Sequence, residues 1–240
     1  MLSSNQRKLI TQLSKKKYRI SNKLFVVEGK KVVNELIASS WPFQNLFTTE
    51  DNFHPDAEKL SLEEMKKITH FKTPSPVLGV FILREVQKLL VEPITIALDG
   101  VSDPGNLGTI IRLCDWFGLS ELICSKTTVD CYNPKVIQAS MGSITRVRCY
   151  YVEDLGVTLT ALQKPIYGAT AKGDSIYTAK LPKEATYIFG SESHGISAYL
   201  SNHLNGELAI PQFRKGSSMA ESLNVANASA IFLSELFRSS

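Results

Sequence analysis

Apolar positions in the second part of the chain come in short continuous runs rather than in alternation with polar positions. Such runs, bounded by turn residues, are typical of strands that are buried on both faces. They cover residues 94–98, 122–124, 165–167, 187–189 and 208–210. The helical spacing of apolar residues between them predicts helices over residues 107–117, 134–141 and 154–163, and a last helix over 222–238. Strands that alternate with helices predict an α/β fold with a parallel sheet covered on both faces.

A smaller α/β unit is predicted before this sheet. After a basic helical stretch, the pattern predicts strands over residues 24–27, 45–48 and 79–83 and helices over 30–39 and 61–69. Ser61-Leu62-Glu63-Glu64 begins the second of these helices with the sequence of a capping box. The boundary falls near residues 91–93, so we expect one domain over residues 1–91 and another over residues 92–240.

Composition narrows the class of protein. The chain has 240 residues, of which 43% are hydrophobic and 21% charged, as in ordinary soluble globular proteins. Its apolar stretches are too short to span a bilayer, and the sequence opens without the apolar core of a signal peptide. The cysteines form no C-x-x-C pair, and the histidines lack the spacing of metal ligands. We therefore expect a cytoplasmic protein with reduced thiols, no metal and no membrane segment.

Charge is distributed unevenly along the chain. Residues 1–31 contain nine basic residues and one acidic residue, a net charge of +8, which leaves −4 on the rest of the chain. Such a cationic stretch is typical of proteins that bind a polyanion such as RNA, and a solvated charged face is the alternative. The candidate RNA-binding residues are Arg7, Lys8, Lys15, Lys16, Lys17 and Arg19.

Ligands bind beyond the carboxyl ends of the strands in parallel sheets, so three loops are candidate sites. In the first loop, Pro104-Gly105 predicts a turn, and Asn106 is suited to cap the helix that follows. Arg112 lies off the apolar stripe of that helix, which lets its guanidinium project toward the strand ends. The loop matches neither nucleotide-binding glycine pattern, and turn geometry alone explains many glycine-rich loops.

The second loop contains Gly190, Glu192 and Gly195 directly after a buried strand. Glycine allows the backbone to approach a ligand closely. The alternatives for Glu192 are hydrogen bonds from backbone amides of a neighbouring loop and an ion pair with a partner's arginine. His194 is a candidate general base, but a single histidine in a loop is more typical of a surface residue.

The third loop runs from Ile210-Pro211 through a polar stretch to Ser222-Leu223-Asn224-Val225. Ser222 is suited to cap the last helix, whose first amides would then face a ligand. Asn224 and Asn227 make the start of this helix unusually polar. Capping is the alternative explanation for these asparagines, more for Asn227 than for Asn224.

Together, in order and content, the three loops resemble the signature motifs of the SpoU (TrmH) family of SPOUT methyltransferases. These motifs are N-x-G-x-x-x-R, G-x-E-x-x-G, and I-P followed by S-L-N-V. They are matched by Asn106, Gly108, Arg112, Gly190, Glu192, Gly195, Ile210, Pro211 and residues 222–225. The run Phe25-Val26-Val27-Glu28-Gly29 is similar to the start of the small RNA-binding domain that many members carry.

The resemblance implies a parallel α/β sheet with a C-terminal trefoil knot, an exception to the rule that chains are unknotted. It implies S-adenosylmethionine as cofactor, a homodimer, and methyl transfer to a ribose 2′-hydroxyl in RNA, with ribosomal RNA favoured over transfer RNA. Arg112 is then the expected catalytic residue, supported by Asn106 and Glu192. The implied cofactor contacts are Gly190, Glu192, Ile210, Ser222, Leu223 and Asn224, with Thr170 or Ala169 in a lesser role.

The chain departs from the family pattern in two places. The stretch between Pro211 and Ser222 is longer and more polar than the family's short apolar turn, and Ala226-Asn227 stands where Ser-Val is common. Two other functions compete with the methyltransferase. A non-catalytic RNA-binding or ribosome-assembly protein explains the basic start but gives the three motifs no purpose. A nicotinamide-dependent oxidoreductase would require the dinucleotide fingerprint, which the sequence lacks.

Overall fold

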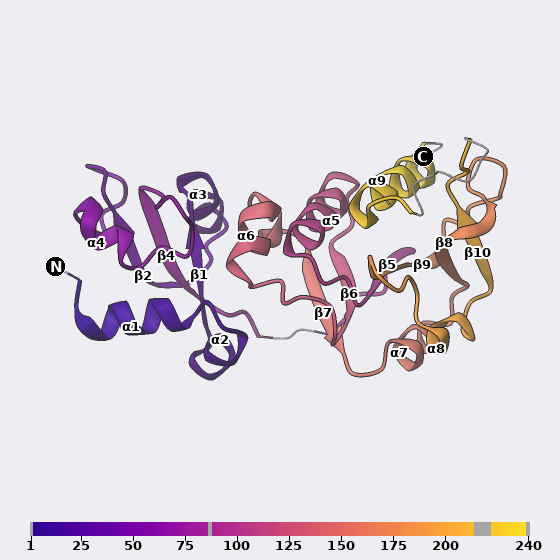
Figure 1. Cartoon of the computed structure of the whole chain (residues 1–240), viewed down its shortest axis with the longest axis horizontal. Helices are drawn as coiled ribbons and strands as arrows, with labels where there is room; N and C mark the ends of the chain where they lie inside the picture. The colour runs from indigo at the N-terminus through magenta and orange to yellow at the C-terminus, as the bar shows by residue number, and fades with distance from the viewer. Residues whose placement is uncertain (1, 86–87, 214–221, 239–240) are drawn as a thin grey trace. The chain divides into compact units, whose positions relative to one another are not determined.

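The computed structural model describes residues 2–85, 88–213 and 222–238. The chain forms two compact units (Figure 1). The first unit comprises Met1–Val86 together with Asp130–Thr145, and the second comprises Gln87–Val129 together with Arg146–Ser240. Each unit has its own sheet.

The first unit is built on a four-stranded sheet in the order β1-β4-β2-β3. Its strands are β1 (Leu24–Glu28), β2 (Phe43–Thr48), β3 (Ala57–Lys59) and β4 (Val77–Ile82), and its helices are α1 (Ser4–Gln12), α2 (Lys16–Asn22), α3 (Lys30–Ala38), α4 (Leu62–Lys66), α6 (Pro134–Ser140) and the 3₁₀ helix η1 (Ser143–Thr145). The predicted strands and helices of this unit are confirmed, with small shifts at their ends. Ser61 forms the predicted capping box with Glu64.

The second unit contains a six-stranded, wholly parallel sheet in the order β10-β8-β9-β5-β6-β7, which confirms the predicted sheet type. Its strands are β5 (Ile94–Asp99), β6 (Glu121–Ser125), β7 (Arg148–Val152), β8 (Ile166–Ser175), β9 (Ala185–Gly190) and β10 (Gly206–Ala209), and its helices are α5 (Pro104–Trp116), α7 (Leu155–Ala161), α8 (Ala198–Ser201) and α9 (Val225–Phe237). Strand β7 is missing from the sequence prediction, and β8 is much longer than predicted.

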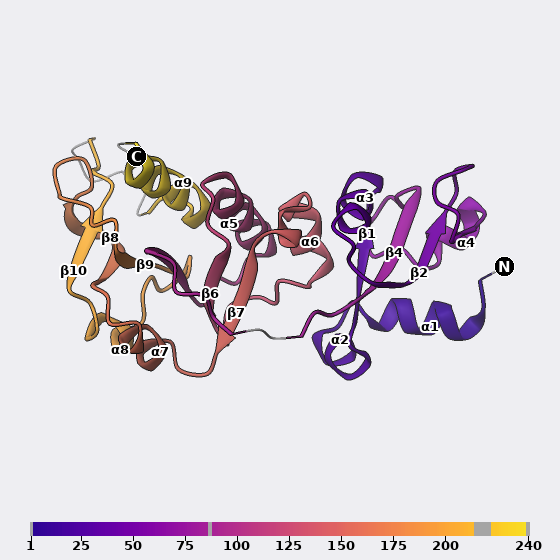
Figure 2. The ribbon, with the colours of Figure 1, turned by 180° about the vertical axis from the view of Figure 1, so that it is seen from behind.

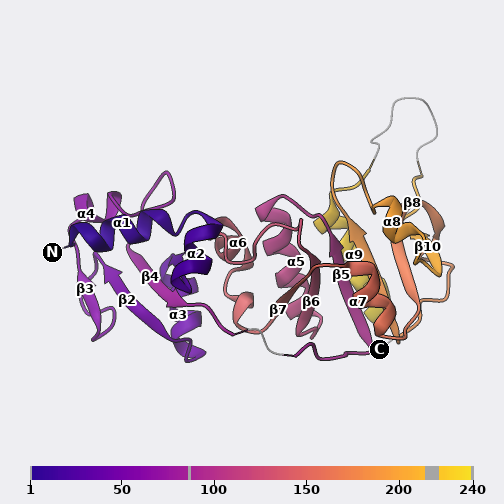
Figure 3. The same cartoon turned by 90° about the horizontal axis from the view of Figure 1, so that it is seen from below.

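Helices cover both faces of this sheet. α5 and α9 lie on one face and α7 and α8 on the other (Figure 1 and Figure 3), as the view from behind also shows (Figure 2). On the α7 and α8 face, Leu155, Leu159 and Leu200 pack against apolar side chains of the sheet. On the other face, the ring of Phe232 in α9 meets Phe189 of β9 edge to face, with 5.4 Å between centroids. Burial on both faces explains why the central strands are continuous apolar runs.

Among the described residues, no helix is long and apolar enough to cross a membrane, and no group of three or more His, Cys, Asp or Glu side chains is arranged to hold a metal ion.

The first unit differs from the predicted domain over residues 1–91 because a segment from much later in the sequence, Asp130–Thr145, packs within it. The guanidinium of Arg19 donates from Nε to the carboxylate of Asp130, at 2.9 Å, and from Nη1 to backbone carbonyls at the end of α1. The ring of Tyr132 packs on Phe25 of β1, with 4.8 Å between centroids.

Arg19 is only 2% exposed. This burial contradicts its expected place on an RNA-binding surface, because its donors are already directed to Asp130 and to the carbonyls of Leu13 and Ser14. Arg19 is a structural residue of the first unit.

Replacing Asp130 by Ala should therefore destabilise the first unit strongly. The change leaves a buried guanidinium without its carboxylate, which typically costs about 3–5 kcal/mol. Urea unfolding followed by Trp41 fluorescence in a Trp116→Phe background reports on this unit, because Trp41 is buried there.

The matched control is Asp51→Ala, which breaks the exposed ion pair with Lys59 in the same unit. Exposed pairs contribute about 0–1 kcal/mol. Equal losses of stability in the Asp130 and Asp51 variants would contradict the structural role of Arg19.

Candidate active site

Two of the three candidate loops leave the sheet from neighbouring strand ends. β5 and β9 pair in parallel, so that Asp99 at the end of β5 lies opposite Gly190 at the end of β9. The strand order reverses between these two strands. The loop after β5 leads to α5 on one face, whereas the loop after β9 leads to α8 on the other. The two loops thus diverge from a switch point, where parallel sheets commonly bind ligands.

Asn106 links the first loop to the other two. Its side-chain Nδ2 donates to Glu192 Oε1, at 2.7 Å, and its Oδ1 accepts from Asn224 Nδ2, at 2.9 Å. The structure therefore brings one residue of each loop into a single chain of hydrogen bonds, Glu192–Asn106–Asn224. We refer to it as the motif chain.

The prediction that Asn106 caps α5 is wrong. The cap is Asp103, whose carboxylate accepts from the backbone N–H of Asn106, at 2.9 Å. Pro104 takes the first position of the helix, where its missing N–H costs nothing. Asp103 was missed although Asp followed by Pro is itself a signal for a helix start. With the cap supplied by Asp103, the side chain of Asn106 can serve the motif chain.

The prediction that Ser222 caps the last helix is also wrong. α9 begins at Val225, and Asn224 caps it by accepting from the backbone N–H groups of Ala226, at 3.0 Å, and Asn227, at 3.2 Å. Asparagine caps a helix as well as serine does. It also keeps an amide Nδ2 that can donate, and Asn224 uses this group for Asn106.

Both carboxylate oxygens of Glu192 accept a hydrogen bond from the first loop. Its Oε1 accepts from Asn106 and its Oε2 from the backbone N–H of Ser102, at 3.4 Å. The interpretation that Glu192 receives backbone amides of a neighbouring loop is thus confirmed for Ser102.

The second loop folds back on itself. Ser191 and Gly195 exchange two backbone hydrogen bonds, and Gly195 has a φ of +66°. A Cβ on Gly190 would lie 2.0 Å from the backbone carbon of Gly195. This loop therefore requires glycine at position 190 for its own packing, a reason that differs from the close approach of a ligand expected from the sequence.

Other predicted site residues lie outside the motif chain. Arg112 is exposed on α5, off the buried stripe of that helix, as predicted. His194 is exposed, and its Nδ1 bonds the hydroxyl of Ser193 at 2.7 Å, in keeping with a surface residue. Thr170 donates to Glu207 of β10, at 2.9 Å.

The third loop is described at its two ends. Ile210 is half-buried after β10, while Ser222 and Leu223 are exposed before α9. The polar stretch between them includes residues 214–221, which lie outside the described residues.

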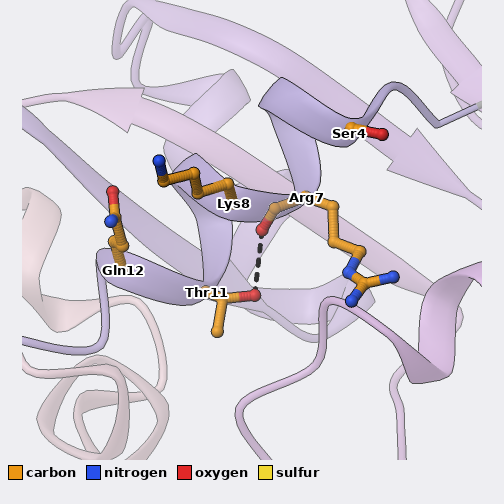
Figure 4. A pocket seen from close by; sticks show the side chains of 5 residues that line it. All are labelled: Ser4, Arg7, Lys8, Thr11 and Gln12. Atoms are coloured by element: carbon orange, nitrogen blue, oxygen red, sulfur yellow. Dashed lines mark hydrogen bonds between the residues drawn. The ribbon is translucent and has the colours of Figure 1, made fainter.

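Five of the six candidate RNA-binding residues of the first unit are exposed. Arg7 and Lys8 on α1 line a polar hollow of about 400 Å³ together with Ser4, Thr11 and Gln12 (Figure 4). The side chains of Lys15, Lys16 and Lys17 are exposed at the start of α2. Only Arg19, among the six candidates, is buried.

Family models match both parts of the chain. Residues 93–234 match the SpoU rRNA Methylase family, and residues 5–79 match the MRM3-like substrate binding domain. The chain is 29% identical to a 23S rRNA (guanosine(2553)-2′-O)-methyltransferase of Bacillus subtilis, over 94% of this chain and 93% of that protein. It is 30% identical to a 23S rRNA (guanosine-2′-O-)-methyltransferase of Neisseria meningitidis, over 64% of this chain and 61% of that one.

Solved structures of methyltransferases also resemble this chain. A TrmH-family protein from Porphyromonas gingivalis is 37% identical and superimposes over 100% of both chains with a TM-score of 0.88. An AdoMet-bound rRNA methyltransferase from Sinorhizobium meliloti is 26% identical over 99% of this chain and 96% of that one, with a TM-score of 0.85. Since the family match spans more than half of the chain and contains all three loops of the motif chain, the chain belongs to the SpoU rRNA methylase family.

Proposed function

We propose that this chain transfers a methyl group from S-adenosylmethionine to the 2′-hydroxyl of a ribose in RNA, with ribosomal RNA as the substrate class. The observation that carries the proposal is the motif chain, because it joins Asn106, Glu192 and Asn224 from three loops beside the carboxyl ends of the central strands β5 and β9. The names of the relatives from Bacillus subtilis and Neisseria meningitidis support ribosomal rather than transfer RNA.

The residues around the motif chain fit this cofactor. Leu223 exposes 52% of its surface directly beside the polar Asn224, and the half-buried Ile210 follows β10. An apolar edge next to amide and carboxylate groups suits a molecule with an aromatic ring and charged ends. When bound, S-adenosylmethionine supplies a methyl group activated by its sulfonium. The residues that would hold it are Gly190, Glu192, Ile210, Ser222, Leu223 and Asn224.

Arg112 serves as an electrostatic catalyst in this proposal. A ribose hydroxyl is a poor nucleophile until its proton is accepted or polarised. Arginine keeps its proton in proteins, so Arg112 provides a fixed positive charge rather than a base. Its exposed guanidinium can grip the phosphate next to the ribose and stabilise the negative charge that develops on the attacking oxygen. Water or the phosphate then accepts the proton.

Glu192 and Asn106 act as supports for this chemistry. Both carboxylate oxygens of Glu192 already accept hydrogen bonds, from Asn106 and from Ser102. Glu192 is therefore better suited to hold the first loop against the second than to take a proton from the ribose.

The family resemblance also supports a trefoil knot in the C-terminal segment and a homodimer. The position of α9 is consistent with the knot, because its N-cap Asn224 bonds to Asn106 at the start of α5. A cytoplasmic location is supported by the cysteines Cys114, Cys124 and Cys131, which are buried as free thiols.

Mapping of 2′-O-methyl groups in total RNA tests the function. Cells that lack the protein should lose methylation at a ribose of ribosomal RNA, and the wild-type gene should restore it. An unchanged map, together with no binding of S-adenosylmethionine by calorimetry, would favour the non-catalytic RNA-binding or ribosome-assembly protein.

Replacing Arg112 by Lys should lower the turnover number by about 100-fold, the usual effect of removing one group that stabilises charge in the transition state. Lysine keeps the charge but loses the planar fork that grips a phosphate. Single-turnover methyl transfer to ribosomal RNA measures the effect, and RNA affinity should stay within about twofold.

Arg238→Lys is the matched control for Arg112, because Arg238 is an exposed arginine of the same unit that pairs with Glu235. This control should retain its activity. Full turnover in the Arg112→Lys variant, with RNA binding intact, would contradict the proposed role.

Replacing both Arg7 and Lys8 by Gln should weaken RNA binding uniformly across RNA sequences. Each phosphate contact that is lost should reduce the slope of log affinity against log salt by about 1. Titration of RNA at several salt concentrations gives that slope. The matched control replaces Lys59 and Lys66 by Gln, since these lysines of the first unit already pair with Asp51 and Glu63. Equal effects in the two double variants would argue against the hollow on α1 as an RNA contact.

A further inference from the structure

Two buried hydroxyls hold the start of the first loop. The backbone N–H of Gly100 donates to Ser125 Oγ, at 2.9 Å, and to Thr128 Oγ1, at 3.2 Å. Ser125 and Thr128 follow one another closely at the end of β6, and they are 9% and 2% exposed. We refer to these two residues as the hydroxyl clamp. Because water cannot replace a buried acceptor, the N–H of Gly100 depends on them.

The clamp is itself fixed in place. Thr128 Oγ1 donates to the carbonyl of Leu98 in β5, at 3.3 Å, and the oxygens of Ser125 and Thr128 lie 3.2 Å apart. One step further along each loop, the backbone N–H of Val129 donates to the carbonyl of Val101, at 2.9 Å. The loop after β6 therefore holds two consecutive residues of the loop after β5.

The backbone conformation of Gly100 allows its N–H to reach both hydroxyls. Its φ is +73°, in the left-handed region that glycine adopts without strain. A Cβ at this position would lie 3.4 Å from Thr127 Oγ1 and 3.7 Å from the Cβ of Ser191, so the second loop also lies against the turn.

The residues after Gly100 connect this turn to the motif chain through hydrogen bonds. Ser102 directs its N–H at Glu192, at 3.4 Å, and Asp103 caps α5 through the N–H of Asn106, at 2.9 Å. Asn106 then meets Glu192 and Asn224. Hydrogen bonds of Gly100, Ser102 and Asp103 thus connect the hydroxyl clamp with the site.

We propose that Ser125 and Thr128 are positioning residues for methyl transfer, which act through Gly100 to set the place of Asn106 between Glu192 and Asn224. This inference rests on the proposed function for its kinetic consequence. The position of Asn106 can be measured without any catalysis.

The experiment compares the full-length wild type with the Thr128→Val variant and with the Ser125→Ala/Thr128→Val double variant. Thr128→Val alone keeps one acceptor for Gly100, so it remains informative if the double variant folds poorly. Thr128→Ser keeps the hydroxyl and should restore function. Thr186→Val is the matched control, because Thr186 is a fully buried threonine at the opposite end of β9 from Gly190, and its hydroxyl has no partner in the described part of the chain.

Two readouts are taken: the kinetic constants of methyl transfer to ribosomal RNA, and the NMR signal of the Asn106 side-chain amide in the protein alone. The double variant should lose about 10- to 100-fold in kcat, because a small misplacement of a catalytic group costs that much, while KM for RNA stays within about twofold. The Asn106 signal should shift in this variant and remain unchanged in the Thr128→Ser and Thr186→Val variants.

A double variant with wild-type kcat and an unshifted Asn106 signal would overturn the inference. A Thr128→Ser variant as impaired as Thr128→Val would also overturn it, because the effect would then come from packing rather than from the hydroxyl. If the wild type transfers no methyl group but the Asn106 signal shifts as expected, the proposed function fails and the positioning of Asn106 by the clamp stands.

Discussion

The parallel pairing of β5 with β9 is the constraint on which the site depends. It places Asp99 opposite Gly190, so the loops that follow start side by side and diverge to opposite faces of the sheet. The Asp99 carboxylate then accepts from the backbone N–H of Ser197, at 2.8 Å, which ties the far end of the second loop to the same strand end. A slip of one residue in this pairing would turn Asp99 to the other face and separate the loops. Because both strands are buried on both faces, packing opposes such a slip.

The motif chain requires amide side chains, because carboxylates at the same positions could not form its hydrogen bonds. An amide both donates and accepts, so Asn106 can receive a hydrogen bond from Asn224 and pass one to Glu192. A carboxylate at position 106 could not donate to Glu192 and would set two negative charges face to face. Asn224 combines the same two capacities, since its oxygen caps α9 while its nitrogen joins the motif chain. The same side chain thus begins the last helix and joins the site.

The sequence predicts the central strands and the three loops, because continuous apolar runs and motif spacing are local features. It does not predict β7, whose residues are all half-buried, as expected of a strand at the edge of a sheet. It also misassigns both helix caps. Asp103 and Asn106, like Ser222 and Asn224, are comparable capping residues, and the choice depends on partners from other loops. Arg19 is misassigned for the same reason, because its charge is visible in the sequence but its partner Asp130 lies far along the chain.

Arg19 also shows that the first unit needs residues from two separate stretches of the sequence. Residues 130–145 lie inside the stretch that matches the methylase family, yet they pack within the first unit. A fragment that ended at residue 91 would leave Arg19 without Asp130 and Phe25 without Tyr132. A buried guanidinium left without its carboxylate would alone remove a large share of the stability of a small domain. The first unit is therefore not formed by the N-terminal residues alone, because residues 130–145 contribute Asp130 and Tyr132 to its packing.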